Sequence, residues 1–133
     1  MSQEMGNDER EIRQWLEEFA DAVRDVDYEL GKTMFGADVV GFGTYASMLV
    51  GLEALVEGQW KNIWGVTRGF RFRLDEMHFG VVNDDAWVAV PWDSEGQNPD
   101  GSWYERPGRA TIILERRDGR WVAIHTHLSL YPR

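Results

Sequence analysis

The spacing of apolar residues changes once along the chain, near Gly65, and this change restricts the fold more than any other feature of the sequence. Before it, apolar residues recur at three- and four-residue steps, as in amphipathic helices. After it, Phe70, Phe72 and Leu74 alternate with charged residues, as in half-buried strands. Helices followed by strands favour an α+β fold over a parallel α/β sheet.

The first helix has the clearest pattern in the chain. Asp8 and Glu11 have the spacing of a capping box, with Asp in place of the usual Ser or Thr. One apolar face then continues through Ile12, Trp15, Leu16, Phe19, Val23 and Val26. This helix is expected to open a single domain of residues 8–133, after a flexible N-terminus of residues 1–7.

Two further helices and a short strand are expected before Gly65. A short helix runs from Asp27, its candidate cap, to about residue 35, and residues 39–42 form a strand. A third helix follows Gly51. It carries Trp60 and Trp64 four residues apart, which makes the two indoles neighbours on its surface.

Turn signals divide the second half of the chain into four longer strands. Turns are expected at residues 83–85, at 98–101 and at Asp118-Gly119, which is the strongest hairpin signal. They separate strands at residues 70–75, 86–93, 103–116 and 121–130. Because hairpin links join neighbouring strands in opposite directions, the sheet is expected to be antiparallel.

Alternation assigns the residues of the last two strands to the two faces of the sheet. The face toward the helices receives Ala110, Ile112, Leu114, Val122, Ile124, Thr126, Leu128 and Leu130. The opposite face receives Trp121, His125 and His127 among small and polar residues. A mixed face that carries aromatic side chains favours a homodimer interface, so these three are candidate interface residues.

The composition restricts the classes of partner. The 133 residues include no cysteine, which excludes disulfides, thiolate metal sites and a cysteine nucleophile. The net charge of −9 argues against nucleic acid and against anionic membrane surfaces. The sequence has no run of about 18 apolar residues for a membrane span, and a cytoplasmic protein is expected.

The C-terminal third of the chain resembles a known family. Residues 108–115 (GRATIILE), 117–121 (RDGRW) and 124–132 (IHTHLSLYP) resemble the C-terminal hairpin of SnoaL-like domains, which belong to the nuclear-transport-factor-2-like superfamily. The association domain of calcium/calmodulin-dependent protein kinase II has a similar hairpin. The resemblance covers about residues 8–132. It implies a cone-shaped α+β fold with a strongly curved antiparallel sheet, an internal pocket, and dimers packed through the convex sheet face.

A carboxyl group in that pocket is the candidate catalytic group. If Trp87, Ala89 and Asp93 share the concave face, Asp93 reaches the pocket. Desolvation there would raise its pKa and suit a general base acting on an enolisable carbon, which is how superfamily isomerases and cyclases use a pocket acid. The alternative is an Asp93 that is solvated or paired with an arginine.

Aromatic residues are the candidate walls of the pocket. Trp15, Trp60, Trp64 and Trp87 are expected to line it, with ordinary core packing as the alternative for at least half of them. The resemblance implies an oxyanion-donor tyrosine on the first helix for an isomerase. That helix has no tyrosine, so Tyr28 and Tyr45 are the candidate substitutes.

The concave face of the last strands supplies further candidate binding residues, Ile112, Thr126 and Leu128. In the kinase association domain, arginines line the pocket. The matching positions here hold Asp93, Ile112 and Leu128, so the resemblance does not extend to carboxylate binding of that type.

The pair His125-x-His127 also fits a metal site, because both imidazoles of alternate strand residues point the same way. A third ligand would be needed, and His78 is the only other histidine. The alternative is hydrogen bonding across a dimer interface, and no metal ligand is assigned.

Two main functions remain open. One is a cofactor-free protein that binds a small, mostly apolar organic molecule, and that acts as an isomerase, cyclase or lyase if Asp93 is its base. The other is a non-catalytic homodimerisation or interaction module. In the second case the protein's own side chains fill the pocket, and the cavity falls below the roughly 300 Å³ that is usual for ligand sites.

Overall fold

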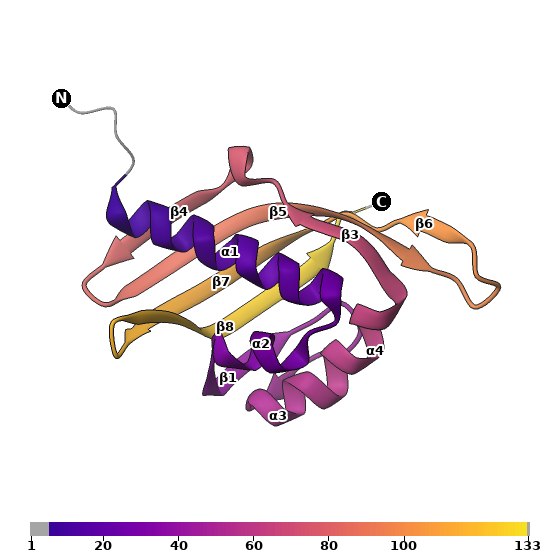
Figure 1. Ribbon diagram of the computed structural model, residues 1–133, viewed down its shortest axis with the longest axis horizontal. Coiled ribbons are helices and arrows are strands. Elements are labelled where there is room, and N and C mark those ends of the chain that lie inside the picture. The colour runs from indigo at the N-terminus through magenta and orange to yellow at the C-terminus, as the bar shows by residue number, and fades with distance from the viewer. Residues whose placement is uncertain (1–5, 133) are drawn as a thin grey trace.

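The computed structural model describes residues 6–132 and shows helices packed on one face of a curved sheet (Figure 1). The helical elements are α1 (Asn7–Asp25), α2 (Tyr28–Thr33), α3 (Leu52–Leu55) and α4 (Lys61–Ile63). The strands are β1 (Phe35–Phe42), β2 (Leu49–Val50), β3 (Thr67–Phe72), β4 (His78–Val82), β5 (Asp85–Gln97), β6 (Trp103–Glu105), β7 (Gly108–Arg117) and β8 (Arg120–Leu130). The expected α+β class is confirmed.

The first helix α1 lies across the sheet, with its expected apolar face buried against the strands (Figure 1). It begins at Asn7, with Gly6 as a cap that makes no side-chain hydrogen bond. The expected capping role of Asp8 is therefore wrong. Asp8 lies in the first turn, and its carboxylate pairs with Arg116 of β7 at 2.8 Å. Val26 also leaves the apolar face, because it ends the helix in a left-handed conformation.

The expected third helix is one continuous helical segment of changing pitch. A π-helical turn (Val56–Trp60) joins α3 to α4, and a 3₁₀ turn (Trp64–Val66) ends the segment. Gln59 and Trp60 in the π turn are buried, and so is Trp64. In α2, by contrast, Asp27 caps the helix as expected, by accepting a hydrogen bond from the Leu30 N–H.

The sheet has the strand order β2-β1-β8-β7-β5-β3, and β4 and β6 also pair with β5. All its pairs are antiparallel except β1 with β8. The sheet is therefore mixed, because β1 reaches β8 only after the chain has passed through the helices and the other strands. A second 3₁₀ turn (Leu74–Glu76) connects β3 to β4.

The register of β5 differs from the expected one by one residue. Its even-numbered residues, Ala86, Val88, Val90 and Trp92, are buried toward the helices. Trp87, Ala89 and Asp93 therefore lie on the outer face, and the placement of Trp87 and Asp93 in the pocket was wrong. The physical reason is hydrophobic burial, since the even-numbered set is the more apolar of the two.

A β-bulge at Ile124 changes which residues of β8 face the helices. Ala123 pairs with Leu114 and His125 with Ile113, so one extra residue lies between them. Trp121 is only 6% exposed on the inner face, and its expected interface placement was wrong. Beyond the bulge, Thr126 and Leu128 face inward and His125 and His127 face outward, as expected.

The strand expected at residues 103–116 is interrupted at Arg106-Pro107, between β6 and β7. The β5–β6 hairpin projects from the body of the molecule, at the right in Figure 1. Pro107 has no N–H to donate to a neighbouring strand, and the chain changes direction here. This break brings the Arg106 side chain back toward the helices.

Candidate functional site

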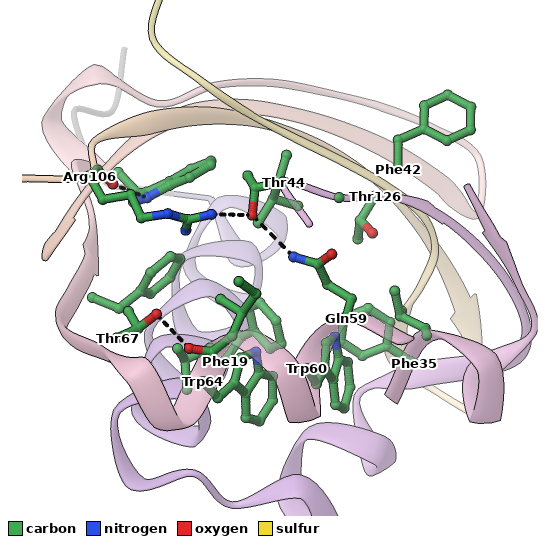
Figure 2. A pocket seen from close by; sticks show the side chains of 17 residues that line it. Phe19, Phe35, Phe42, Thr44, Gln59, Trp60, Trp64, Thr67, Arg106 and Thr126 are labelled. Atoms are coloured by element: carbon green, nitrogen blue, oxygen red, sulfur yellow. Dashed lines mark hydrogen bonds between the residues drawn. The ribbon is translucent and has the colours of Figure 1, made fainter. Parts of the chain in front are cut away.

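A small cavity lies between the helices and the inner face of the sheet, with a volume of about 50 Å³. Apolar side chains, many of them aromatic, form most of its wall (Figure 2). The aromatic ones come from α1, β1, the third helical segment, β3 and β5, and they are Phe19, Phe35, Trp60, Trp64, Phe70 and Trp92. Phe42 also borders the cavity, but its ring points away from it, toward the outer-face histidines (Figure 2). The cavity lies at the position that the cone-shaped architecture implies.

The floor of the cavity is a stack of two indoles. Trp60 and Trp64 are parallel to within 18°, with ring centroids 4.5 Å apart. Phe19 packs against both rings, at 6.0 and 5.8 Å. On their far side, a Cβ on Gly31 would approach both indoles to 2.9 Å, so only glycine fits there without displacing them. The stack is therefore fixed from both sides.

Polar groups gather at one end of the cavity, where the loop of residues 43–48, here called the strap, passes over it (Figure 2). The Gln59 Oε1 atom accepts hydrogen bonds from the backbone N–H groups of Tyr45 and Ala46, at 3.1 and 2.9 Å. Its Nε2 atom donates to Thr44 Oγ1 at 3.1 Å. A Cβ on Gly43 would overlap the Gln59 carboxamide, which explains the glycine at this position.

Arg106 reaches the same end of the cavity from the opposite side. Its Nη2 atom donates to Thr44 Oγ1 at 2.7 Å. Its backbone is fixed by the sheet, because its carbonyl accepts hydrogen bonds from Trp92 Nε1 at 3.2 Å and from Ser94 Oγ at 2.6 Å. The guanidinium is thus held across one end of an aromatic cavity.

Arg106 differs in its partners from the other half-buried arginines of the described chain. Those four are each paired with a carboxylate, and they are Arg13, Arg73, Arg116 and Arg117. Within residues 6–132, Arg106 contacts no carboxylate, and it is the one ionisable residue that lines the cavity. Its single side-chain acceptor is a neutral hydroxyl, although a guanidinium has five N–H donors.

Asp93 lies outside the cavity, on the outer face of the sheet. Its carboxylate accepts from Arg73 Nη2 at 2.8 Å and pairs with Arg71 Nη2 at 2.9 Å. The hydrogen bonds from Arg73 lower the pKa of Asp93 below its usual value, and the charge of Arg71 acts in the same direction. The expected raised pKa and the role of general base are therefore wrong, and the arginine-paired alternative is confirmed.

Replacing Asp93 by asparagine is expected to cost about 0.5–1 kcal/mol of unfolding free energy at pH 7, because the ion pairs are partly exposed. A carboxyl with a lowered pKa stabilises the fold above its unfolded pKa of about 3.9, and this contribution is lost as the pH falls through the folded value. Urea unfolding at pH 7 and pH 3 should show the difference shrinking in acid. A difference that grows in acid would contradict the pairing.

The other residues expected to bind a ligand fall into three groups. Trp60, Trp64, Thr126 and Leu128 line the cavity. Trp15, Tyr28 and Ile112 do not line the cavity but pack around it. The indole of Trp15 donates to the Met34 carbonyl, and Tyr28 stacks on Trp64. Ile112 is buried in the sheet. Tyr45 is 63% exposed and Trp87 is on the outer face, so neither of these reaches the cavity.

The sequence interpretation missed the three polar residues that meet at the strap, Thr44, Gln59 and Arg106. Gln59 was visible as a polar residue on the buried face of the third helix. Arg106-Pro107 was visible as a break in the alternation of the expected strand. Neither signal shows that the three side chains meet, because they come from segments far apart in the sequence.

The histidines of the outer face are not arranged as a metal site. The His125 Nδ1 atom is 2.7 Å from the Val40 carbonyl oxygen, and Phe42 packs edge-on against both His125 and His127. His78 lies in β4, separated from His127 by Ala89 and Thr111 in the strands between. Among the described residues, no cluster of three or more potential His, Asp or Glu ligands is present.

The fold and its internal cavity define a cone-shaped α+β domain of the cystatin-like kind. The model of the SnoaL-like domain matches residues 12–133, and the chain belongs to this family. None of the helices in residues 6–132 is long and apolar enough to span a membrane. No protein with a curated description matches the chain.

Several solved structures share the fold. An NTF2-like protein of unknown function from Pseudomonas putida is 27% identical, with a TM-score of 0.75, and the match covers 92% of this chain and 85% of that one. A ketosteroid isomerase-like protein from Erwinia carotovora is 15% identical, with a TM-score of 0.80, over 97% of this chain and 100% of that one. The association domain of the C. elegans kinase CaMKII is 17% identical, with a TM-score of 0.73, and the match covers 92% of this chain and 95% of that one.

Proposed function

We propose that this protein binds a small, mostly apolar organic molecule inside the cone, at the cavity between the aromatic floor and the strap. The observation that carries the proposal is the composition of the cavity wall. Apolar side chains, many of them aromatic, form most of it, and the polar groups of Thr44, Gln59 and Arg106 converge at one end, which is the pattern of small-molecule sites. Arg106, which lines the cavity and donates only to a neutral hydroxyl, has further N–H donors for a polar group of a ligand.

The size of the cavity bears on how a ligand enters. Its volume of about 50 Å³ is well below the roughly 300 Å³ that is usual for ligand sites. Binding of anything larger than a few heavy atoms therefore requires the strap to move outward. Hydrogen bonds with the side chains of Gln59 and Arg106 hold the strap over the cavity, so this opening has to break some of them.

The proposal includes no proton transfer by a carboxylate. None of the residues that line the cavity is an acid or a histidine, and Asp93 is paired on the other face of the sheet. The protein binds its ligand through shape, aromatic contact and the polar groups of the strap end.

Filling the cavity tests this site. Thr126 is buried and lines the cavity, whereas Thr111 is exposed on the outer face of the neighbouring strand. Thr126→Leu is expected to weaken binding of benzyl alcohol, a small neutral aromatic probe, at least about tenfold, because the added methyl group and lost hydroxyl change the cavity wall. Thr111→Leu is the matched control and should bind like the wild type.

Titration calorimetry with both variants and the wild type measures the difference. A wild-type protein that does not bind the probe at millimolar concentration, or equal binding by all three proteins, would contradict the cavity as the site. Native mass spectrometry of the purified protein adds a second measurement. An organic adduct that leaves on denaturation and is absent from Thr126→Leu would supply the mass of the natural ligand.

A second candidate function, a homodimerisation module, is favoured by the small volume of the cavity and by the outer face of the sheet. Trp87, Ile113 and His125 lie side by side there across β5, β7 and β8, and Trp87 is 44% exposed. A row of large side chains across a sheet is suited to packing against a second copy.

Ile113→Glu is expected to convert such a dimer into a monomer, because a charge in the middle of the row would be buried without a partner. Light scattering with size-exclusion chromatography should then give 15.4 kDa for the variant and twice that mass for the wild type. Val66→Glu, in the exposed turn that precedes β3 and outside the row of Trp87, Ile113 and His125, is the control and should stay dimeric. A wild-type protein that is monomeric would rule out this interface.

A further inference from the structure

The Arg106 guanidinium, which has no carboxylate partner among the described residues, restricts the class of ligand that the cavity can bind. Arg106 points across this end of the cavity toward Thr44 (Figure 2). The Thr44 hydroxyl receives two donors, one from Arg106 at 2.7 Å and one from Gln59 at 3.1 Å. The neutral Thr44 hydroxyl oxygen thus lies where the Arg106 guanidinium, the only charged donor among the described residues that line the cavity, points.

A carboxylate satisfies this guanidinium better than a hydroxyl does. It is planar, carries the opposite charge and accepts two parallel N–H hydrogen bonds from one arginine, and charge-assisted hydrogen bonds are about twice as strong as neutral ones. Apolar side chains on most of the remaining wall lower the local polarity, which strengthens the attraction further.

The overall charge of the protein restricts the number of charges on the ligand. The chain has a net charge of −9, so its field opposes the approach of anions, and the opposition grows with each additional charge. A single arginine also neutralises a single charge. A monoanion with an apolar body is therefore favoured over a phosphate ester or a dicarboxylate.

The geometry points to a small aromatic monocarboxylate as the ligand class, with its ring against the Trp60–Trp64 stack and its carboxylate on Arg106 in place of the Thr44 hydroxyl. This inference rests on the proposed binding function. Entry of the carboxylate breaks the contact between Arg106 and Thr44, so recognition of the acid also releases one of the two side chains that hold the strap. Arg106 then both selects a carboxylate and helps to hold the strap closed.

The test compares benzoate with benzyl alcohol, which has the same ring but no charge, at pH 7 by titration calorimetry. The wild type is expected to bind benzoate at least about tenfold more tightly than benzyl alcohol. Arg106→Gln should weaken benzoate binding about 10- to 100-fold and should weaken benzyl alcohol binding far less, so that the preference for benzoate over benzyl alcohol is lost. Arg109→Gln, which removes an exposed outer-face arginine outside the cavity lining, should leave both unchanged.

Thr44→Val provides a second, independent variant, because it removes the hydroxyl that competes for Arg106. It is expected to tighten benzoate binding about three- to tenfold more than it tightens benzyl alcohol binding, because loosening of the strap affects both probes and the freed guanidinium favours only the acid. Circular dichroism before each titration shows that the variants are folded.

The results with the two probes distinguish a wrong carboxylate assignment from a wrong binding site. Binding of benzyl alcohol and benzoate with equal affinity, unchanged in Arg106→Gln, would overturn the carboxylate assignment and leave the apolar site in place. Absence of binding of either probe to the wild type would overturn the proposed function itself. Selective loss of benzoate in Arg106→Gln, with a gain in Thr44→Val, is the result that the inference requires.

Discussion

Trp92→Ala is expected to lower the free energy of unfolding by about 3–5 kcal/mol, the largest loss from any single truncation considered for this protein. Trp92 is only 1% exposed and packs against Phe70 with ring centroids 5.8 Å apart. Its indole N–H also donates to the Arg106 carbonyl and to Ser94 Oγ. Truncation therefore leaves an empty volume and removes a support of the Arg106 backbone.

Urea unfolding followed by circular dichroism measures this loss, and Trp87→Ala on the same strand is the matched control. Trp87 is 44% exposed on the outer face, so its truncation removes far less buried surface and should cost less than half as much. Equal losses for the two variants would contradict the register of β5. That register is also what removes Asp93 from the cavity.

Gly108→Ala is expected to destabilise the protein by about 2–3 kcal/mol, although only one methyl group is added. A Cβ at this position would overlap the Trp92 ring and would lie 2.5 Å from the Ser129 carbonyl oxygen. The oxygen belongs to the backbone of β8, so the steric conflict can be relieved only by separating β7 from β8 or by displacing a buried indole. Both changes reach the wall of the cavity.

Gly65→Ala is the control for this prediction. No atom lies within 4 Å of its hypothetical Cβ, and its backbone is in a 3₁₀ turn that alanine adopts readily. This variant should be neutral or more stable by up to about 1 kcal/mol, since alanine restricts the unfolded chain. Thermal unfolding of both variants suffices, and a Gly108→Ala protein as stable as Gly65→Ala would contradict the close approach of β7, β8 and Trp92.

The order of elements could be predicted from the sequence because it depends on local patterns. The change of spacing near Gly65 separates helices from strands, and Asp118-Gly119 joins β7 to β8. The parallel pairing of β1 with β8 could not be predicted in this way, because no turn connects these two strands. Pairing between segments this distant depends on how the whole chain packs.

The faces of the strands could be predicted only where the alternation is uninterrupted. On β7, Ala110, Ile112 and Leu114 face the helices as expected. On β8, the bulge at Ile124 moves Trp121 to the inner face, and a single extra residue of this kind leaves no sign in the sequence pattern. On β5, the sequence does indicate the correct inner face, since the set of alternate residues that contains Trp92 is more apolar than the set that contains Asp93.

The aromatic floor of the candidate site could be predicted from the sequence, but its polar end could not. Trp60 and Trp64 could be identified because helical spacing makes them neighbours. Arg106, Thr44 and Gln59 meet through tertiary structure alone, from the β6–β7 break, the strap and the π turn. Arg106 stands out because it lacks the carboxylate partner that the other half-buried arginines of the described chain have, and those partners are known only from the structure.

Binding inside the cone can be tested by titrating the ¹⁵N-labelled protein with benzyl alcohol and following the indole N–H resonances of its tryptophans. Trp60, Trp64 and Trp92 line the cavity, whereas Trp87 and Trp103 lie outside its lining and serve as internal controls. If the ligand binds inside the cone, the first three resonances shift saturably and the last two do not shift. Shifts confined to Trp87 and Trp103, or no shifts at all, would contradict a ligand site inside the cone.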